Sequence, residues 1–280
     1  MRLSCPILDD ATEVAPTAYS RDSWTVVRCR STDLVFLANP PAYSQLAEQY
    51  AWEKTCREET LRRRANQPIA WRLSEAIKRL RHALFPRRNR FLALARQVAV
   101  EDLGDRSLRF LDVGCGCGTL MKKYQQSLQA RGVEAVPIGI EVSHQLASAA
   151  QRQVDEFGGK VLVTNSIDGA AQLESRSIDL VLMASFLEHE FQPRRLFREL
   201  HRVLAEDGVM VVKVPNFASW NRVVRGKKWS GFRYPDHVSY FTPRTLALLA
   251  EKENFLVARQ TLRDKFPLND NMYAVLKKAA

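Results

Sequence analysis

An apolar run leads directly into a glycine-rich loop at residues 108–118, which read LRFLDVGCGCG. The run 108–113 predicts a short buried β-strand, and residues 119–131 predict a helix that ends at Gly132. The loop glycines stand at alternate positions: Gly114, Gly116 and Gly118. Glycine tolerates positive φ angles and lets other atoms approach the backbone closely. This order of strand, loop and helix therefore predicts a ligand site at the carboxyl end of the strand.

Strand and helix continue to alternate along the chain after this unit. Short apolar runs predict further strands at 136–140, 160–163, 178–183 and 209–214. Amphipathic segments predict helices at 91–103, 143–157, 193–204 and 243–252. Two last apolar runs, 255–262 and 272–276, are expected to close the sheet as a hairpin. The pattern is typical of the α/β class and predicts a doubly wound, mostly parallel seven-stranded sheet with helices on both faces.

The chain before this domain predicts a small α+β extension. We place the extension at residues 1–88 and the domain with the glycine loop at residues 89–280. Residues 1–22 show no period and are expected to be irregular, whereas 24–37 predict two short strands around a turn. Helical patterns follow at 42–64 and at 68–85, and the second carries apolar residues at spacings of three and four among arginines and lysines.

Composition limits the class of protein. The chain has 280 residues, 46% of them apolar, and a net charge of +11. It contains no apolar run of the eighteen or more residues that a membrane span needs. Its five cysteines are odd in number, and two of them lie in the glycine loop, which favours a reducing compartment over a disulfide framework. We therefore expect a cytoplasmic protein.

Acidic residues beside the loop indicate which ligand it binds. Asp112 precedes the first glycine, and the glycine spacing differs from the G-x-G-x-x-G pattern that binds a dinucleotide. S-adenosylmethionine carries an ammonium and a sulfonium and no phosphate, so a carboxylate suits it. Glu141 ends the next strand, where it can accept the ribose hydroxyls or remain a solvated acid. Asn165 and Ser166 follow the third strand, where they can meet an adenine edge or form a simple turn.

Three motifs, LDVGCGCG, IDLVLMASFLEH and LFRELHRVLAEDGVMVVKVPN, carry a family resemblance. Together they resemble the class I (Rossmann-like) S-adenosylmethionine-dependent methyltransferases, in particular the branch of ubiquinone-type O-methyltransferases and small-molecule methyltransferases. The resemblance covers roughly residues 91–260. It implies that Asp112 and the loop glycines surround the methionine part and that Glu141 takes the ribose. It further implies that Asn165 and Ser166 lie near adenine, where many relatives have Asp, and that Ala184 and Ser185 face the cofactor.

Two histidines are candidates for catalysis. Transfer to oxygen needs a group that removes a proton near neutral pH, and histidine does so naturally. His189 follows the fourth strand, near the expected position of the methyl group. His237 lies in a segment that approaches the substrate in resembling proteins, with the matching residues Trp229, Pro235, Tyr240 and Phe241. The alternative for His189 is a histidine that orders its loop, and for His237 a hydrogen-bonded lid residue.

The N-terminal cysteines invite comparison with a zinc site. Structural zinc needs four thiolate or imidazole ligands, as two C-x-x-C pairs would supply. Here only the first cysteine of each pair is present, Cys5 and Cys29. The segment VVRCRSTDLVFLANPPAY resembles the zinc-ribbon preface of some methyltransferases in this branch. We interpret it as a degenerate copy and expect no bound metal.

Eleven basic and three acidic residues lie between Arg57 and Arg90. The basic helix 68–85 is therefore a solvated face, a contact with an anionic membrane near a lipid-like substrate, or a nucleic-acid contact. The last is disfavoured because no RNA- or DNA-binding module is present. A second basic stretch, Arg222–Arg233, is expected to frame an acidic substrate or to form a lid.

The sequence thus predicts an S-adenosylmethionine-dependent methyltransferase that acts on a small-molecule or lipid-like acceptor at oxygen. We expect it in the cytoplasm, with a peripheral membrane contact as one interpretation of its basic helix. A sugar or natural-product C- or N-methyltransferase and a non-catalytic S-adenosylmethionine-binding partner protein remain as alternatives.

Overall fold

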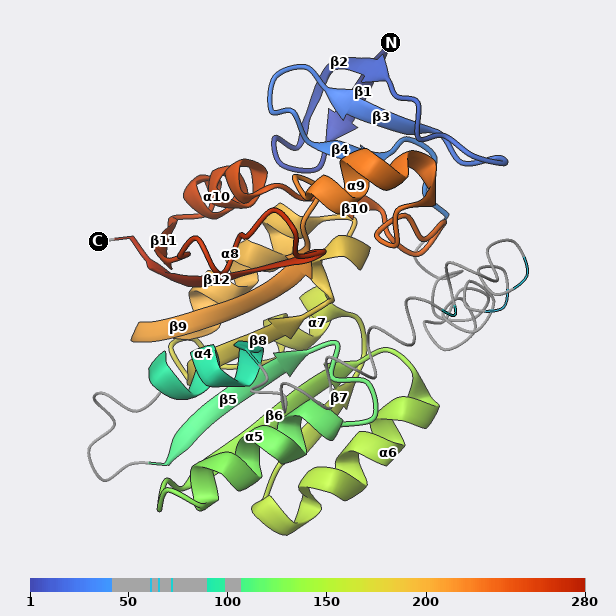
Figure 1. Ribbon diagram of the computed structural model, residues 1–280. Coiled ribbons are helices and arrows are strands. Elements are labelled where there is room, and N and C mark those ends of the chain that lie inside the picture. The colour runs from blue at the N-terminus through green and yellow to red at the C-terminus, as the bar shows by residue number, and fades with distance from the viewer. Residues whose placement is uncertain (42–60, 62–64, 66–71, 73–89, 99–106, 280) are drawn as a thin grey trace.

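The computed structural model describes residues 1–41, 61, 65, 72, 90–98 and 107–279. Its main element is a seven-stranded sheet in the order β11-β12-β9-β8-β5-β6-β7 (Figure 1). Five strands pair in parallel: β5 (Leu108–Val113), β6 (Ala135–Glu141), β7 (Lys160–Val163), β8 (Ile178–Ala184) and β9 (Leu204–Pro215). The antiparallel hairpin of β11 (Phe255–Arg259) and β12 (Asn271–Lys278) completes the sheet beside β9. The predicted α/β class and the closing hairpin are therefore confirmed.

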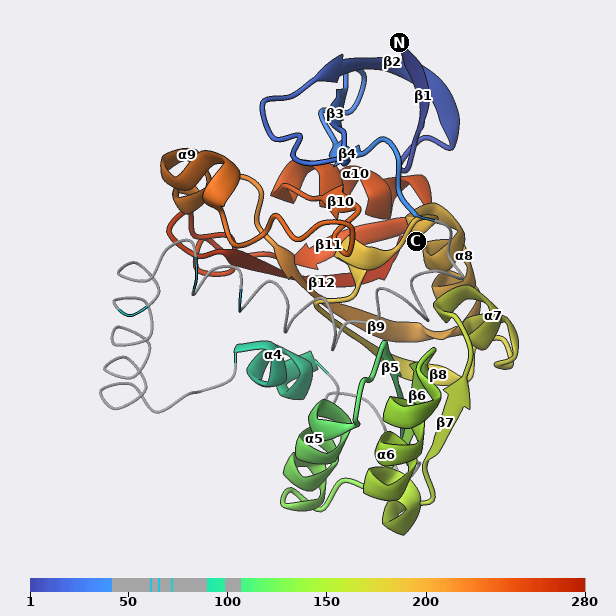
Figure 2. The same cartoon turned by 90° about the vertical axis from the view of Figure 1, so that its right-hand side faces the viewer.

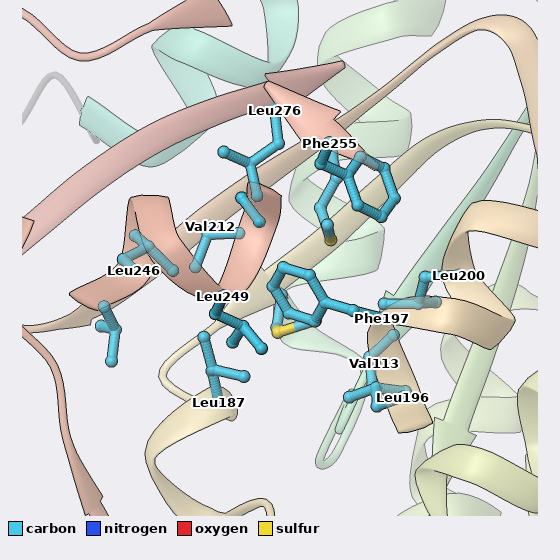
Figure 3. Packing of buried hydrophobic residues seen from close by; sticks show 14 of the residues in the cluster. Val113, Leu187, Leu196, Phe197, Leu200, Val212, Leu246, Leu249, Phe255 and Leu276 are labelled. Carbon is cyan, nitrogen blue, oxygen red and sulfur yellow. The ribbon is translucent and has the colours of Figure 1, made fainter. Parts of the chain in front are cut away.

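Helices cover both faces of this sheet because alternate strand residues point to opposite sides. Phe110 belongs to the apolar cluster under α4 (Arg90–Val98), α5 (Thr119–Gln129) and α6 (His144–Val154). Its neighbour Leu111 belongs to the cluster under α7 (Ser166–Ala171), α8 (Pro193–Val203) and α10 (Pro243–Lys252). Figure 3 shows the second cluster, where Phe197 and Phe255 pack edge to face at 5.8 Å. None of the helices described is long and apolar enough to cross a membrane.

The strand order reverses at β5. From there the chain continues outward to β6 and β7, and it then returns to place β8 on the other side of β5. The connections on the two sides of β5 run to opposite faces, so the carboxyl ends of β5 and β8 border a crevice of the kind where open α/β sheets bind ligands. The glycine loop and the segment with His189 both begin at this edge.

A second sheet of five strands lies beside the first, in the order β1-β2-β3-β4-β10. Its strands are β1 (Arg2–Cys5), β2 (Asp10–Pro16), β3 (Val26–Cys29), β4 (Val35–Leu37) and β10 (Ser239–Tyr240). β3 and β4 confirm the two strands predicted within residues 24–37. The expectation that residues 1–22 are irregular is wrong. Their two strands are short, and they are stabilised by antiparallel pairing with each other and with β3, which no local period reveals.

The N-terminal sheet is joined to the main domain in two ways. β10 comes from the segment between β9 and α10, residues 216–242, which we call the lid segment after its predicted role. It pairs with β4, so residues 239–240 complete the N-terminal sheet. Below the sheet, Cys5 and Ile7 belong to the same buried cluster as Phe197 of α8, and Arg194 of α8 donates a 2.9 Å hydrogen bond to the Leu8 carbonyl. Figure 2 shows the sheet above α10. The N-terminal strands therefore cover the domain at the side from which the lid emerges.

Other predictions differ from the structure in detail or fall outside it. α7 and α9 (Trp220–Arg225) were not predicted because each has only six residues. Ser143 caps α6, since its hydroxyl accepts a hydrogen bond from the Leu146 amide at 3.3 Å. The predicted helices at 42–64 and 68–85 lie outside the described residues, apart from single positions.

Candidate functional site

The glycine loop after β5 is packed closely against two neighbours, at Gly114 and at Gly118. All three glycines have positive φ angles, which residues with a side chain rarely adopt. A Cβ at Gly114 would lie 2.2 Å from the Phe186 ring, so this ring packs directly on the loop. A Cβ at Gly118 would lie 2.9 Å from the Ala150 Cα of α6, whereas one at Gly116 would meet no described atom within 4 Å. The loop is thus packed on both sides and open at its centre.

This packing predicts the effect of a methyl group at Gly118. Gly118→Ala is expected to lower the free energy of unfolding by about 1–3 kcal/mol, because the new Cβ meets backbone at a strained φ of 78°. Gly132→Ala is the matched control, since its φ is 73° and no atom lies within 4 Å of the added Cβ. We expect the control to lose no more than about 1 kcal/mol in a denaturant titration. Equal losses in the two variants would contradict the close approach to α6.

Asp112, the acid before the loop, is almost completely buried. Only 2% of its surface is exposed, and Oδ2 has no hydrogen-bond partner among the residues described. Burial, and to a lesser degree the charge of Glu141, raises the pKa of Asp112 to about 8. A buried carboxyl group without a partner is costly, and a cationic ligand is the partner that would relieve this cost.

Glu141, at the end of β6, closes the loop from the neighbouring strand. Its two carboxylate oxygens accept hydrogen bonds from the backbone amides of Gly116 and Ser143, each at 2.9 Å. Glu141 therefore holds the loop through Gly116 from the same sheet edge as Asp112.

Asn165 and Ser166 have structural partners where they follow β7. Asn165 caps α7, because its Oδ1 accepts a 2.8 Å hydrogen bond from the Asp168 amide. Ser166 is buried and donates a 2.6 Å hydrogen bond to Glu190 Oε2. Their contact with adenine stays a prediction. At the end of β8, Ala184 is half-buried, and Ser185 has a φ of 60° with its amide bonded to the Lys213 carbonyl at 2.8 Å.

His189 lies at the end of a short 3-10 helix, η2 (Leu187–His189), which begins directly after Phe186. Its Nδ1 lies 3.1 Å from Asp236 Oδ1 and 2.9 Å from the Asp236 backbone oxygen. Both neighbours accept hydrogen bonds, so Nδ1 carries the proton and Nε2 has a free lone pair when the ring is neutral. Burial alone would lower the pKa of His189, but the Asp236 carboxylate outweighs it and raises that pKa above its ordinary value.

Asp236 is therefore a candidate site residue that the sequence analysis missed. It is 4% exposed and also forms a 2.7 Å ion pair with Arg233. Burial alone would raise its pKa, but His189, followed by His237 and Arg233, lowers the pKa to about 2. A carboxylate beside His237 in the segment RYPDH was the available signal, but only the fold shows that it faces His189.

His237 packs edge to face on His189, with ring centroids 4.7 Å apart. Its Nδ1 lies 2.8 Å from the Gly231 carbonyl oxygen, so Nδ1 again carries the proton. Burial and the charge of His189 hold the pKa of His237 well below its ordinary value. The structure thus brings together the two predicted histidines, one with a raised pKa and one that is neutral at pH 7.

Two further polar residues at this edge were missed. Glu188 is 2% exposed and Asn216, after β9, is 1% exposed. Within the described ranges, Glu188 Oε2 and Asn216 Nδ2 find no hydrogen-bond partner. Buried polar atoms are almost always paired in folded proteins. Their position beyond β8 and β9, beside the crevice that Asp112 borders, marks this edge as the place where a ligand supplies the missing partners.

Glu188, His189 and His237 could also contribute one ligand atom each to a metal ion, since these atoms lie within 4.8 Å of one another.

In the N-terminal sheet, the thiols of Cys5 and Cys29 each lie beside a threonine hydroxyl. Cys5 Sγ lies 3.4 Å from Thr32 Oγ1, and Cys29 Sγ lies 3.3 Å from Thr12 Oγ1. Thr32 stands three residues after Cys29, where a C-x-x-C pair would have its second cysteine.

Comparison with known proteins gives the family context of this geometry. A family model described as a methyltransferase domain matches residues 72–260. An S-adenosylmethionine-dependent methyltransferase from Mesorhizobium loti is 16% identical, with a TM-score of 0.50 over 67% of this chain and 98% of that chain. The CurJ carbon methyltransferase is 15% identical, with a TM-score of 0.51 over 68% of this chain and 54% of that chain. At these identities the structures show a shared fold alone. No curated protein matches the chain.

Proposed function

Because the chain belongs to the methyltransferase-domain family and is an S-adenosylmethionine-dependent methyltransferase, we propose that it methylates an oxygen atom of a small-molecule or lipid-like acceptor. One observation carries the oxygen assignment: the His189–Asp236 pair beyond β8, three residues from the Phe186 ring that packs on the glycine loop. Carbon and nitrogen acceptors remain the alternative, but an acceptor hydroxyl is the group that most needs a base.

The residues of the glycine loop fit the cofactor. Asp112 offers a buried carboxyl oxygen without a partner to a cationic group, and the open centre at Gly116 leaves room for close approach. Glu141 places a carboxylate directly beside the loop, through its hydrogen bond with the Gly116 amide. In this proposal Asp112 holds the methionine part and Glu141 the ribose, while Ala184 and Ser185 line the same crevice.

The bound cofactor supplies an electrophilic methyl group, and the chain supplies orientation and proton removal. We propose that His189 Nε2 accepts the proton of the acceptor hydroxyl and that Asp236 holds the ring in the required tautomer. His237, neutral at pH 7, positions the acceptor beside His189. Phe186 covers the loop and excludes water from it. Positioning of this kind accounts for much of the catalysis when the leaving group is already good.

We also propose an origin for the N-terminal sheet and a branch for the enzyme. Two turns begin at cysteines, with the Leu8 amide bonded to the Cys5 carbonyl and the Asp33 amide bonded to the Cys29 carbonyl. These turns support a zinc ribbon that has lost half of its ligands. In this proposal the sheet now serves as a cover for the lid, and the enzyme belongs to the ubiquinone-type and small-molecule branch.

Transfer of radiolabelled methyl groups into a cell extract tests the function. We expect label in the lipid or small-molecule fraction, and at least a hundredfold less with an Asp112→Asn variant. Label confined to the nucleic-acid or protein fraction would reject the acceptor class. If no fraction is labelled although the protein binds S-adenosylmethionine, a non-catalytic binding protein would be the better description.

A further inference from the structure

A group of exposed apolar side chains lies outside the site. Among the described residues, three of them are on α9 and three in the loop that follows β11. The most exposed are Val224 at 86% and Leu262 at 80%, followed by Val223, Trp220, Leu268 and Phe266. Single exposed apolar residues are ordinary, but a contiguous group marks an interaction surface.

Hydrogen bonds between the two segments make this group one surface. The Trp220 amide donates to the Pro267 carbonyl at 2.8 Å, and Asn221 Nδ2 donates to the Leu268 carbonyl at 3.1 Å. We call α9 together with residues 261–269 the α9 surface. α9 lies at the periphery of the molecule (Figure 2). Its apolar residues therefore share one exposed face, although they come from segments forty residues apart in sequence.

The inner side of α9 is fixed, so its apolar face is not exposed by fraying. Arg222 donates hydrogen bonds to the Phe217 carbonyl at 2.9 Å and to the Tyr19 hydroxyl at 2.7 Å. Its guanidinium also lies over the Phe217 ring, 4.6 Å from the centroid. The Ser219 hydroxyl caps the helix by accepting from the Arg222 amide at 3.2 Å. α9 is thus anchored through the arginine while it presents Trp220, Val223 and Val224 outward.

The charges around this surface have one sign. From 219 to 231 and from 261 to 269, every exposed charged side chain is a cation: Arg225, Lys227, Lys228 and Arg263. The one acid in these segments, Asp264, is buried and forms a 2.6 Å ion pair with Arg90. An apolar face that contains tryptophan and is bordered by cations complements the interface of an anionic bilayer.

We infer that the α9 surface docks on anionic lipid bilayers, with Trp220 and Val224 entering the acyl boundary and the cations contacting the headgroups. The segment that carries His237 follows α9 and η3 (Gly226–Lys228) directly in the chain. Docking therefore brings the start of this segment to the membrane. This last step rests on the proposed function, because it gives a lipid-like acceptor a direct path from the bilayer to His189. The docking itself does not depend on that function.

Vesicle flotation of the full chain tests the inference. We expect the protein to float with phosphatidylcholine vesicles that contain phosphatidylglycerol, to float far less with phosphatidylcholine alone, and to be released by salt. The double variant Trp220→Ser/Val224→Ser should bind at least tenfold more weakly, and Lys227→Gln/Lys228→Gln should also weaken binding. Leu256→Ser is the matched control, because Leu256 is 44% exposed on β11, outside the residues that define the α9 surface, and should leave flotation unchanged.

Two results of the flotation assay would overturn the inference. The first is that the parent chain does not float with anionic vesicles. The second is that the double variant floats like the parent, which would assign binding to other residues. A dimer detected by light scattering that the double variant dissociates, without vesicle binding, would assign the surface to a second copy. S-adenosylmethionine binding by the double variant serves as the folding check and should be unchanged. If flotation holds but no lipid is labelled in the extract, the docking stands and the lipid-like acceptor fails.

Discussion

Asp112→Asn is expected to lower the affinity for S-adenosylmethionine severely while leaving the free protein at least as stable as the parent. Removing one partner of a buried charge contact costs about 2–5 kcal/mol, which corresponds to a roughly 30- to 4,000-fold loss of affinity. Asp112 Oδ2 is buried without a partner in the residues described. The asparagine side chain has nearly the same shape but cannot carry the charge that pairs with a cationic ligand.

The direction of the stability change follows from the pKa of Asp112, which is about 8 in the folded chain against an ordinary value of 3.8. The folded state therefore binds more protons than the unfolded state between these values, and the Asp112 contribution destabilises the fold progressively as pH rises through this window. The variant lacks this penalty. A melting temperature at pH 7 that is equal to or above that of the parent, without the shift that ligand gives the parent, is the expected result.

Calorimetry adds a measurement that would be unaffected if Asp112 had only a structural role. Asp112 is mostly protonated at pH 7 in the free chain, so a cationic ligand should release close to one proton from the parent on binding. The release is measured from the enthalpies of binding in two buffers with different ionisation heats.

Asp179→Asn is the control for Asp112→Asn. Asp179 is also buried, but its carboxylate accepts a hydrogen bond from the Arg109 amide at 2.8 Å, at the amino end of β8. It should lose stability and keep ligand binding. Unchanged affinity in Asp112→Asn would remove the basis of the cofactor site.

The sequence was sufficient for those parts of the fold that depend on local pattern. β5, β7 and α10 have the predicted boundaries. The two strands coincide with short apolar runs, β5 leads directly into the glycine loop, and α10 begins at a capped position. The N-terminal strands β1 and β2 could not be predicted in this way. They depend on pairing with β3 and on burial against α8, which are contacts between distant parts of the chain.

The site divides in the same way. The common position of Asp112 and Glu141 was predictable because each acid lies at or next to the end of a strand, and the ends of neighbouring parallel strands meet at one edge. Asp236 was not, because it faces His189 across 47 positions of sequence. Ser166 shows the converse: its position after β7 suggested a ligand contact, yet its hydroxyl bonds to the buried Glu190, whose place beneath α7 no local pattern indicates.

The ion pair between His189 and Asp236 also contributes to stability in a defined pH range. The pKa of His189 is raised, so its contribution is fully present below the ordinary histidine value near 6.5 and is lost as pH rises through the folded pKa. The pKa of Asp236 is lowered to about 2, so its contribution is present above 3.8 and is lost as pH falls toward 2. Both contributions are complete between about pH 4 and 6.5, where the enzyme is stable but its base is protonated.

Activity should therefore rise with pH where this stabilisation declines. We expect the rate of methyl transfer to increase through an inflection above 6.5, because only the neutral imidazole can accept a proton at Nε2. His189→Gln should lower kcat by about 10²- to 10⁴-fold and abolish the inflection. Asp236→Asn should move the inflection to lower pH and reduce kcat less, because it removes the carboxylate that raises the pKa of His189 and keeps the imidazole.

The same measurements separate a base from a metal ligand. Glu188, His189 and His237 lie close enough to share a cation, and a metal centre would also be lost in His189→Gln. A base predicts that activity survives a chelator and that the inflection follows the Asp236 substitution. Activity that a chelator abolishes and a divalent cation restores would assign His189 to metal binding. An inflection that does not move in Asp236→Asn would show that the Asp236 carboxylate does not control the titrating group, and the proposed proton transfer would have to be abandoned.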